Sequence, residues 1–380
     1  ITAAGTGDNM NEKHESYLAQ RWELETRSEA DERPRVYLTP KRIVWETNDK
    51  AASVENSAAL LEQKSRQISL HADSLCTLCS REHSAGLLLD FGQEMHGGLE
   101  FSVQSVSGAK HVQLRIRFGE SAAEAMSELG GQTHATNDHA IRDCTMWVQS
   151  LSMNPIGETG FRFARIDLLT RGTSICLKTV NAVMVFRDIP YLGSFQSSDP
   201  LLNRIWDVGA YTVHLNMQQY IWDGIKRDRL VWIGDLHPEI ATIQTVFGDQ
   251  KVIRDSLDYV VSETPDGAWM NDIPSYSMWW IIIQHDYFMQ FGNTEYLKKQ
   301  LPYMKRLCRM LSAQIGADGQ DITPQMRFVD WPTKDNKDAV DTGLQALHVL
   351  AMQCAAHLFR LCGEDDAAAH CQKDYEMLRK

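Results

Sequence analysis

The stretch SFQSSDPLLNRIW, residues 194–206, divides the chain into two parts with different hydrophobic periods. Within it, Ser198 and Asp199 have side-chain oxygens that can cap a helix, and Pro200 is tolerated in a first helical turn. Before this stretch apolar residues alternate with a period of two, and after it they recur with helical spacing. The sequence therefore predicts a β-rich region followed by a helical region.

The first part, from about Val36 to Asp188, consists of short alternating segments separated by Gly, Ser and Asn turns. In HVQLRIRF, residues 111–118, the apolar side chains share one face of a strand and the polar side chains share the other. This pattern predicts an antiparallel, jelly-roll-like β-sandwich in residues 1–190, with residues 1–16 as a flexible segment. Residues 130–139 lack periodicity and are predicted to form a long surface loop.

The second part, residues 191–380, is predicted to be almost entirely helical, as consecutive helical hairpins. The predicted helices span residues 201–221, 238–247, 249–261, 276–292, 294–315, 342–361 and 365–380. The connections 223–235, 268–280 and 328–334 combine charged and aromatic residues. The helix pairs could form a solenoid, a bundle or a toroid, and such connections favour a helical toroid, where they build a single pocket at one end.

Composition excludes several classes of function. The 50 Asp and Glu exceed the 38 Lys and Arg, and no basic run is present, so we expect no nucleic-acid partner. The longest strongly apolar run, MWWIII at residues 278–283, is far shorter than the roughly 20 residues of a membrane span. The pair Cys76 and Cys79 lacks the second pair that a zinc site needs, and we expect no metal.

The segment DGIKRDRLVWIGDLHPE, residues 223–239, is unusually rich in charge for a connection that also holds Trp and Gly. One interpretation is a structural network, with Asp223 paired to Arg227 and Asp228 paired to Arg229. The next helix is expected to begin at Pro238, which would make Glu239 a first-turn residue that offsets the helix dipole. The other interpretation is a binding or catalytic site.

Sugar cleavage explains the same residues. A glycosidase needs one carboxylic acid to protonate the leaving oxygen and a second carboxylate as base or nucleophile, and aromatic rings contact the sugar. Asp223 and Asp235, as neighbouring negative charges, would favour the protonated form that Asp228 needs as an acid.

The order of Asp223, Arg227-Asp228-Arg229, Trp232 and Asp235 resembles the signature of the inverting α-L-rhamnosidases of glycoside hydrolase family 78. Further segments resemble the sandwich and the first barrel helix of that family: LLLDFGQEMHGGLEF, LRIRFGE, GFRFARIDL and FQSSDPLLNRIWDVG. The resemblance covers most of residues 86–380 and implies β-sandwich domains that precede an (α/α)6 barrel.

The resemblance makes Asp228 the general acid, and Asp223 and Asp235 the residues that bind hydroxyls of the rhamnosyl ring. Arg227 and Trp232 would line the same subsite. It implies a rhamnose-containing glycoside or polysaccharide as substrate, no cofactor, and a secreted or periplasmic bacterial enzyme.

Trp279 in PSYSMWW, and Asp330 with Trp331 in FVDWPT, are expected to face the same pocket. For the tryptophans the alternative is packing between helices.

The sequence departs from the family in two respects. Asp228 stands where many members have Glu, which shortens the acid by one methylene. The chain also has about half of the helices of a closed barrel, so the resemblance implies that the general base lies beyond Lys380. Apolar helix faces, including residues 279–283, would then be exposed to water, which is unfavourable. We therefore expect that a further piece of the protein is missing from this chain, that a second chain covers these faces, or that the enzyme was cut.

Two other functions remain open. A non-catalytic carbohydrate-binding protein would keep the loop without a complete acid and base pair. A polysaccharide lyase would need a base such as His237 or Tyr276 beside a group that neutralises charge.

Overall fold

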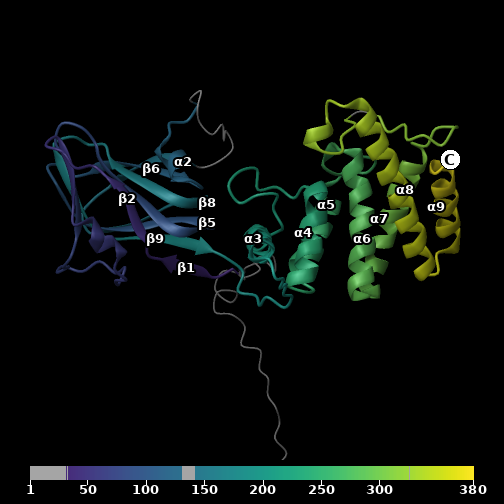
Figure 1. Cartoon of the computed structure of the whole chain (residues 1–380), viewed down its shortest axis with the longest axis horizontal. Coiled ribbons are helices and arrows are strands. Elements are labelled where there is room, and N and C mark those ends of the chain that lie inside the picture. The colour runs from purple at the N-terminus through teal and green to yellow at the C-terminus, as the bar shows by residue number, and fades with distance from the viewer. Residues whose placement is uncertain (1–30, 32, 131–141, 325) are drawn as a thin grey trace, which may run out of the picture. The chain divides into compact units, whose positions relative to one another are not determined.

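The computed structural model describes residue 31 and residues 33–130, 142–324 and 326–380 (Figure 1). The chain divides into residues 1–32, of which only Asp31 is described, and residues 33–380. The predictions for residues 1–16 and for most of the 130–139 loop lie outside the described residues. The strands are β1 (Arg35–Leu38), β2 (Arg42–Glu46), β3 (Ala52–Glu55), β4 (Cys76–Ser80), β5 (Ala85–Ser107), β6 (Val112–Gly119), β7 (Asp143–Val148), β8 (Ser152–Leu168) and β9 (Thr173–Val185).

The strands pair antiparallel throughout, in the order β3-β4-β9-β5-β8-β6-β7, with β1 on β9 and β2 on β5. The first half of β5 pairs with β2 and the second half with β9, while β8 pairs with both halves. The long strands thereby connect two layers around a common apolar core that includes Leu87, Phe101, Ile116 and Phe161. The predicted antiparallel sandwich is confirmed.

Strand β5 bends between its two halves. Its register with β8 shifts between Asp90 and Met95, and Gly92 in this gap has φ 91°, which glycine adopts without strain. The bend turns Gln93 and Glu94 out of the regular alternation and toward the helical part, where the Tyr211 hydroxyl donates a hydrogen bond of 2.5 Å to the backbone oxygen of Glu94.

The helical part follows as predicted, with shifted boundaries. Its helices are α3 (Pro200–Asn216), α4 (Ile233–Val246), α5 (Lys251–Glu263), α6 (Pro274–Phe291), α7 (Thr294–Ser312), α8 (Lys337–Leu361) and α9 (Asp365–Leu378). Short helices η1 (Ser57–Leu61), α2 (Ala122–Met126), η2 (Met270–Asp272) and η3 (Trp331–Thr333) occur in connections. Helix α6 contacts α4, α7 and α8, and α8 contacts α9, so alternate helices pack side by side as in a series of hairpins (Figure 1).

Of the two predicted caps of α3, Asp199 is the one used, and it accepts a hydrogen bond from the Leu201 N–H. The start of α4 differs from the prediction. Helix α4 begins at Ile233, so that Pro238 lies inside it instead of opening it. Pro238 lies beyond the first four N–H groups, which have no helical partner, so α4 lacks the hydrogen bond that a residue with an N–H would make here to the Gly234 backbone oxygen.

The expected exposure of residues 279–283 is wrong. Trp280 and Ile281 are fully buried and Ile282 and Ile283 nearly so, because α6 has neighbours on several sides. Exposed apolar side chains lie instead on α3, where Leu201 and Ile205 are 63% and 59% exposed.

Candidate active site

The segment that follows Trp222 forms a closed loop. The Asp223 N–H donates to the Leu230 backbone oxygen at 3.1 Å, and the Leu230 N–H donates to Asp223 Oδ1 at 2.9 Å. One oxygen of this carboxylate is thus fixed by the loop itself. The predicted loop is confirmed, but it ends at Trp232, the N-cap of α4, and Asp235 lies in the first turn of that helix.

Asp228 occupies the tip of a tight turn. The Arg229 N–H donates to the Arg227 backbone oxygen at 2.8 Å, and both Asp228 and Arg229 have left-handed φ values, 59° and 55°. Non-glycine residues rarely adopt this conformation, although Asp and Asn tolerate it better than most. Such strained positions concentrate at functional sites, where the surrounding structure enforces them.

The basic side chains of the loop do not form the ion pairs of the structural interpretation, Asp223 with Arg227 and Asp228 with Arg229. Lys226 Nζ pairs with Glu120 and Glu124 of the sandwich region, at 2.9 and 2.6 Å. Arg229 donates to the backbone oxygen of Glu158 at 3.0 Å. The ion pair that remains inside the loop, Arg227 with Asp228, spans 4.0 Å and is largely exposed. The basic side chains therefore hold the loop against the sandwich and leave its carboxylates without close cations.

Trp232 is held in place from a neighbouring connection. Asn271 accepts from the Ile233 N–H and donates to the Val231 backbone oxygen, both at 3.1 Å, and so grips the residues on either side of Trp232. The Trp232 and Tyr276 rings meet edge to face at 6.1 Å. A Cβ at Gly234 would lie 2.4 Å from the Tyr276 ring, so this position has no space for a side chain.

These elements border a cavity of about 1240 Å³. Six of the eight predicted site residues line it: Asp223, Arg227, Asp228, Trp232, Asp235 and Trp331. The sequence prediction missed the opposite wall and part of the floor: Gln93, Glu94, Glu120, Arg162, Tyr211, Asn216 and Phe328. Glu94 and Glu120 belong to segments that resemble the family, yet neither segment has a local pattern that points to a site.

Two predicted site residues lie outside the cavity lining. Trp279 packs against His237, with ring centroids 4.4 Å apart, and contacts the helical core. Asp330 caps η3 by accepting from the Trp331 N–H, and its charge contributes to the raised pKa of Asp235. Asp330 thus affects the site in two ways: its negative charge raises the pKa of Asp235, and its hydrogen bond to the Trp331 N–H fixes the backbone of Trp331.

The electrostatics of the cavity favour protonated carboxyl groups. Burial, followed by the charges of Asp228 and Asp235, raises the pKa of Asp223 to about 6. The pKa of Asp235 is raised as well, by burial and by Asp330. The raised pKa values of this site are those of Asp223 and Asp235, the two carboxyl groups predicted to bind sugar hydroxyls.

Glu239 is not a first-turn residue, and the prediction for it is wrong. Because α4 begins at Ile233, Glu239 lies beyond the first turn and is only 8% exposed. It accepts a hydrogen bond from the Asn216 amide at 2.8 Å, and its other oxygen is buried without a partner. Burial, with added repulsion from Asp235 and Asp223, raises the pKa of Glu239 to about 8. At neutral pH this group is mostly a neutral acid beneath the cavity floor.

Comparison with known proteins identifies the helical part. Residues 190–380 match the family model described as the bacterial alpha-L-rhamnosidase 6 hairpin glycosidase domain. The chain belongs to this family. This match confirms the predicted resemblance to the α-L-rhamnosidases.

An alpha-L-rhamnosidase of Formosa agariphila is 33% identical over 78 residues, which is 20% of this chain and 8% of that protein. A GH78 family rhamnosidase of Bacillus sp. GL1 has the same fold, with a TM-score of 0.68 and 19% identity, covering 81% of this chain and 32% of that chain. A rhamnosidase from Klebsiella oxytoca with rhamnose bound gives a TM-score of 0.69 and 16% identity, covering 91% of this chain and 69% of that chain. The chain thus spans about a third of the Bacillus protein.

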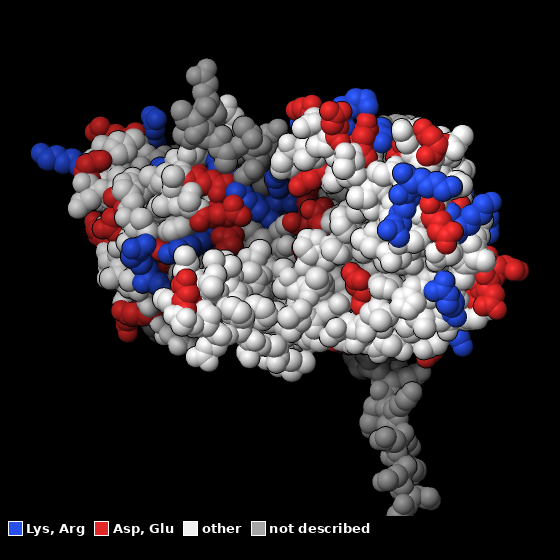
Figure 2. Space-filling view, turned by 45° about the vertical axis from the view of Figure 1, so that its right-hand side comes forward, with Lys and Arg blue, Asp and Glu red and all other residues white. Residues whose placement is uncertain are grey.

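Charge is mixed on the face shown in Figure 2, where acidic and basic side chains adjoin one another. No helix among the described residues is long and apolar enough to cross a membrane. In the same part of the chain, His, Cys, Asp and Glu side chains form no group of three that could hold a metal ion.

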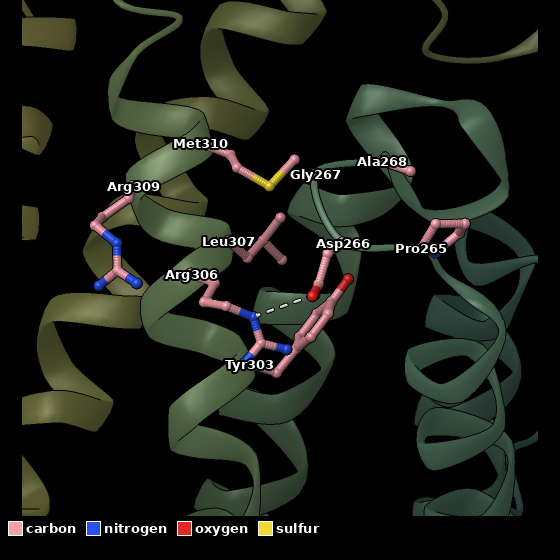
Figure 3. Close-up of a pocket in the computed structure, with 9 residues that line it drawn as sticks. All are labelled: Pro265, Asp266, Gly267, Ala268, Tyr303, Arg306, Leu307, Arg309 and Met310. Atoms are coloured by element: carbon pink, nitrogen blue, oxygen red, sulfur yellow. Dashed lines mark ion pairs between the residues drawn. The ribbon is translucent and has the colours of Figure 1, made fainter.

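A second cavity, of about 450 Å³, lies between the connection 265–268 and helix α7 (Figure 3). Arg306 pairs with Asp266 at 3.7 Å across it and lies over the Tyr303 ring. Its single lining carboxylate is therefore matched by a cation. This cavity lacks the pair of carboxyl groups that glycoside hydrolysis requires.

Proposed function

We propose that the chain is the part of an α-L-rhamnosidase that holds the general acid, and that the enzyme removes terminal α-L-rhamnosyl residues from glycosides or polysaccharides with inversion. The observation that supports this most directly is that Asp223 and Asp235 line the larger cavity beside Trp232 and Tyr276 and form no ion pair with a described residue. A carboxyl group that is not neutralised by an ion pair remains available for sugar hydroxyls and for proton transfer.

Asp228 is the proposed acid. It projects from the tip of a strained turn into the cavity and is 30% exposed, so it can reach a leaving oxygen there. Asp223 and Asp235 would accept hydrogen bonds from ring hydroxyls. Trp232 and Trp331 would contact the apolar face of the sugar.

The second carboxylate of the reaction is not assigned to a residue of this chain. For an inverting enzyme it should stand about 6.5 to 9.5 Å from the Asp228 carboxyl, on the opposite face of the sugar, with a water molecule between. Following the resemblance, we place it beyond residue 380. By the same resemblance the enzyme would be secreted or periplasmic, with a rhamnose-containing glycan as its substrate.

A second candidate is a carbohydrate-binding protein without catalysis. The shorter acid favours it, because Asp228 replaces the Glu of many members and proton transfer tolerates little misplacement. Here the cavity would bind rhamnose and leave it uncut.

A lyase that uses Tyr276 as its base is less well supported. Burial and the charges of Asp235 and Asp330 raise the pKa of Tyr276 to about 12, which opposes its ionisation. The other candidate base, His237, lies 3.6 Å from Asp286 and is absent from the cavity lining.

The test combines hydrolysis of an aryl α-L-rhamnoside by the whole enzyme, in which the second carboxylate is supplied, with calorimetric titration of L-rhamnose on the whole enzyme and on this chain. Turnover that depends on Asp228 supports the enzyme, and rhamnose binding without turnover supports the carbohydrate-binding protein. Failure of both turnover and binding contradicts the two proposals together.

A further inference from the structure

The wall of the larger cavity that faces the Asp223–Trp232 loop comes from the sandwich. It consists of the β5 bend with Gln93 and Glu94, of Glu120 at the end of β6, and of Arg162 on β8. None of these residues has a role in the acid chemistry proposed above. The wall is nevertheless joined to the loop, since Lys226 bridges to Glu120.

Glu94 is the polar group of this wall that lacks a partner. Its Oε1 is buried and makes no hydrogen bond to the described residues, although the side chain lines the cavity. Its backbone is fixed by the Tyr211 hydroxyl. A buried polar atom without a partner is unfavourable, and this one can be satisfied by a ligand group in the cavity.

The charge of the wall discriminates between ligands. Burial and the neighbouring Glu120 raise the pKa of Glu94 to about 8, so that at neutral pH it can donate as well as accept a hydrogen bond. Two cations that line the cavity act on Glu94, and both are already paired: Arg162 with both oxygens of Asp90, at 2.8 and 3.0 Å, and Lys226 with Glu120 and Glu124. A ligand at this wall therefore meets a neutral or negative surface that offers hydrogen bonds.

The size of the cavity leaves room for a second ring. Its volume of about 1240 Å³ exceeds the roughly 300–1,000 Å³ of ordinary small-ligand pockets. The proposed rhamnosyl site occupies the loop side, around Asp223, Asp228 and Asp235. The space between that site and the β5 bend is where the group attached to the rhamnosyl unit must lie.

We propose that the β5 bend forms a second sugar subsite, in which Glu94 binds hydroxyls of the leaving unit, and that this unit is a neutral sugar. The proposal rests on the proposed function and narrows its substrate class. A uronic acid is disfavoured because its carboxylate would approach Glu94 and Glu120 without a free cation from the wall. A flat aryl group would leave the Glu94 carboxyl unsatisfied.

The test is calorimetric titration of the chain with L-rhamnose, with a neutral α-L-rhamnosyl-hexose disaccharide, and with the matching disaccharide that ends in a uronic acid. The neutral disaccharide should bind about tenfold more tightly than rhamnose, equivalent to one good hydrogen-bonding contact, and the uronate should show no such gain.

Three variants accompany the titrations. Glu94→Ala should lose the gain for the disaccharide and keep the affinity for rhamnose. Glu94→Gln, which can still donate and accept, should keep most of the gain. Glu82→Ala, at an exposed position outside the cavity, serves as the matched control. Thermal unfolding of each variant shows whether it is folded.

The outcomes separate the two proposals. If rhamnose binds but the disaccharide binds no tighter, or if Glu94→Ala keeps the gain, the subsite is overturned and the rhamnosyl site stands. If neither sugar binds to the folded chain, the proposed function fails and the subsite fails with it. Tighter binding of the uronate would overturn the assignment of a neutral sugar.

Discussion

Asp90 and Glu94 lie on the same strand, and the fold treats their carboxyl groups in opposite ways. Asp90 accepts hydrogen bonds from Arg162 and Arg42, and these bonds outweigh burial and lower its pKa to about 2. Glu94, past the bend, has no ion pair with a described residue, and burial raises its pKa to about 8. Asp90, whose carboxylate is bound by two arginines, and Glu94, whose carboxyl group has no ion pair with a described residue, are thus only four residues apart.

The same contrast holds between the sandwich and the cavity. In the sandwich, Asp167 pairs with Arg117 and Arg165. Around the cavity, Asp223 and Glu239 make no ion pair within the described part of the chain, and the pKa of each is raised. Carboxylates that stabilise the fold are neutralised by protein cations, whereas those of a binding site are left for a ligand.

The largest effect should come from Asp228→Asn. We expect the turnover of an aryl α-L-rhamnoside by the whole enzyme to fall by about 10²–10⁴-fold, because the proton donor is lost. The affinity for rhamnose should change little. Asn tolerates the left-handed backbone that Asp228 adopts, so the turn should persist. Rate and titration measurements on the same preparation check this, and an equal loss of binding and turnover would make Asp228 a structural residue.

Asp167→Asn should lower the stability of the fold and leave the binding of rhamnose unchanged. It removes the charge that pairs with the buried Arg117 at 2.9 Å and leaves Glu128, at 3.0 Å, as the remaining partner, so the free energy of unfolding should fall by about 1 to 3 kcal/mol. Denaturant unfolding measures the change, and rhamnose affinity of the folded fraction should be unaltered. Asp255→Asn, which breaks an exposed pair with Lys251, should cost under about 0.5 kcal/mol and serves as the control. If the two variants lower the free energy of unfolding by the same amount, Asp167 does not stabilise the fold more than an exposed carboxylate does.

Asp223→Ala should weaken rhamnose binding by about ten- to a hundredfold and lower turnover with it, because hydrogen bonds to a charged group are lost. Asp235→Ala should act in the same direction. In Asp223→Asn the amide oxygen can still accept from the Leu230 N–H, which separates closure of the loop from binding of sugar. If Asp223→Asn binds rhamnose as well as the unchanged chain does, the carboxylate only closes the loop.

The smallest effect concerns pH and Glu239. Its ordinary pKa of 4.5 is raised to about 8 in the folded chain, so folding favours its protonated form. The contribution of Glu239 to stability is therefore fully present below pH 4.5 and is lost as the pH rises from 4.5 to 8. Glu239→Gln should match the unchanged chain at pH 4 and exceed its stability at pH 8. Equal stability of the two proteins at pH 8 would show that Glu239 ionises without cost.

The sequence by itself determined the order of a sandwich and helical hairpins, because hydrophobic period is a local property that survives in the linear pattern. It also determined the loop side of the site, since Asp223, Asp228, Trp232 and Asp235 lie close together in the chain. The comparisons confirm the family that this pattern indicated.

Only the tertiary structure decided which carboxyl groups are free. The sequence suggested pairs between neighbours, Asp223 with Arg227 and Asp228 with Arg229, but the loop bases turn to the sandwich. Likewise Glu94 and Glu239 carry no local sign of burial or of a missing partner. Ion pairing and desolvation depend on side chains brought together from distant parts of the chain, and the linear spacing of residues does not encode these distances.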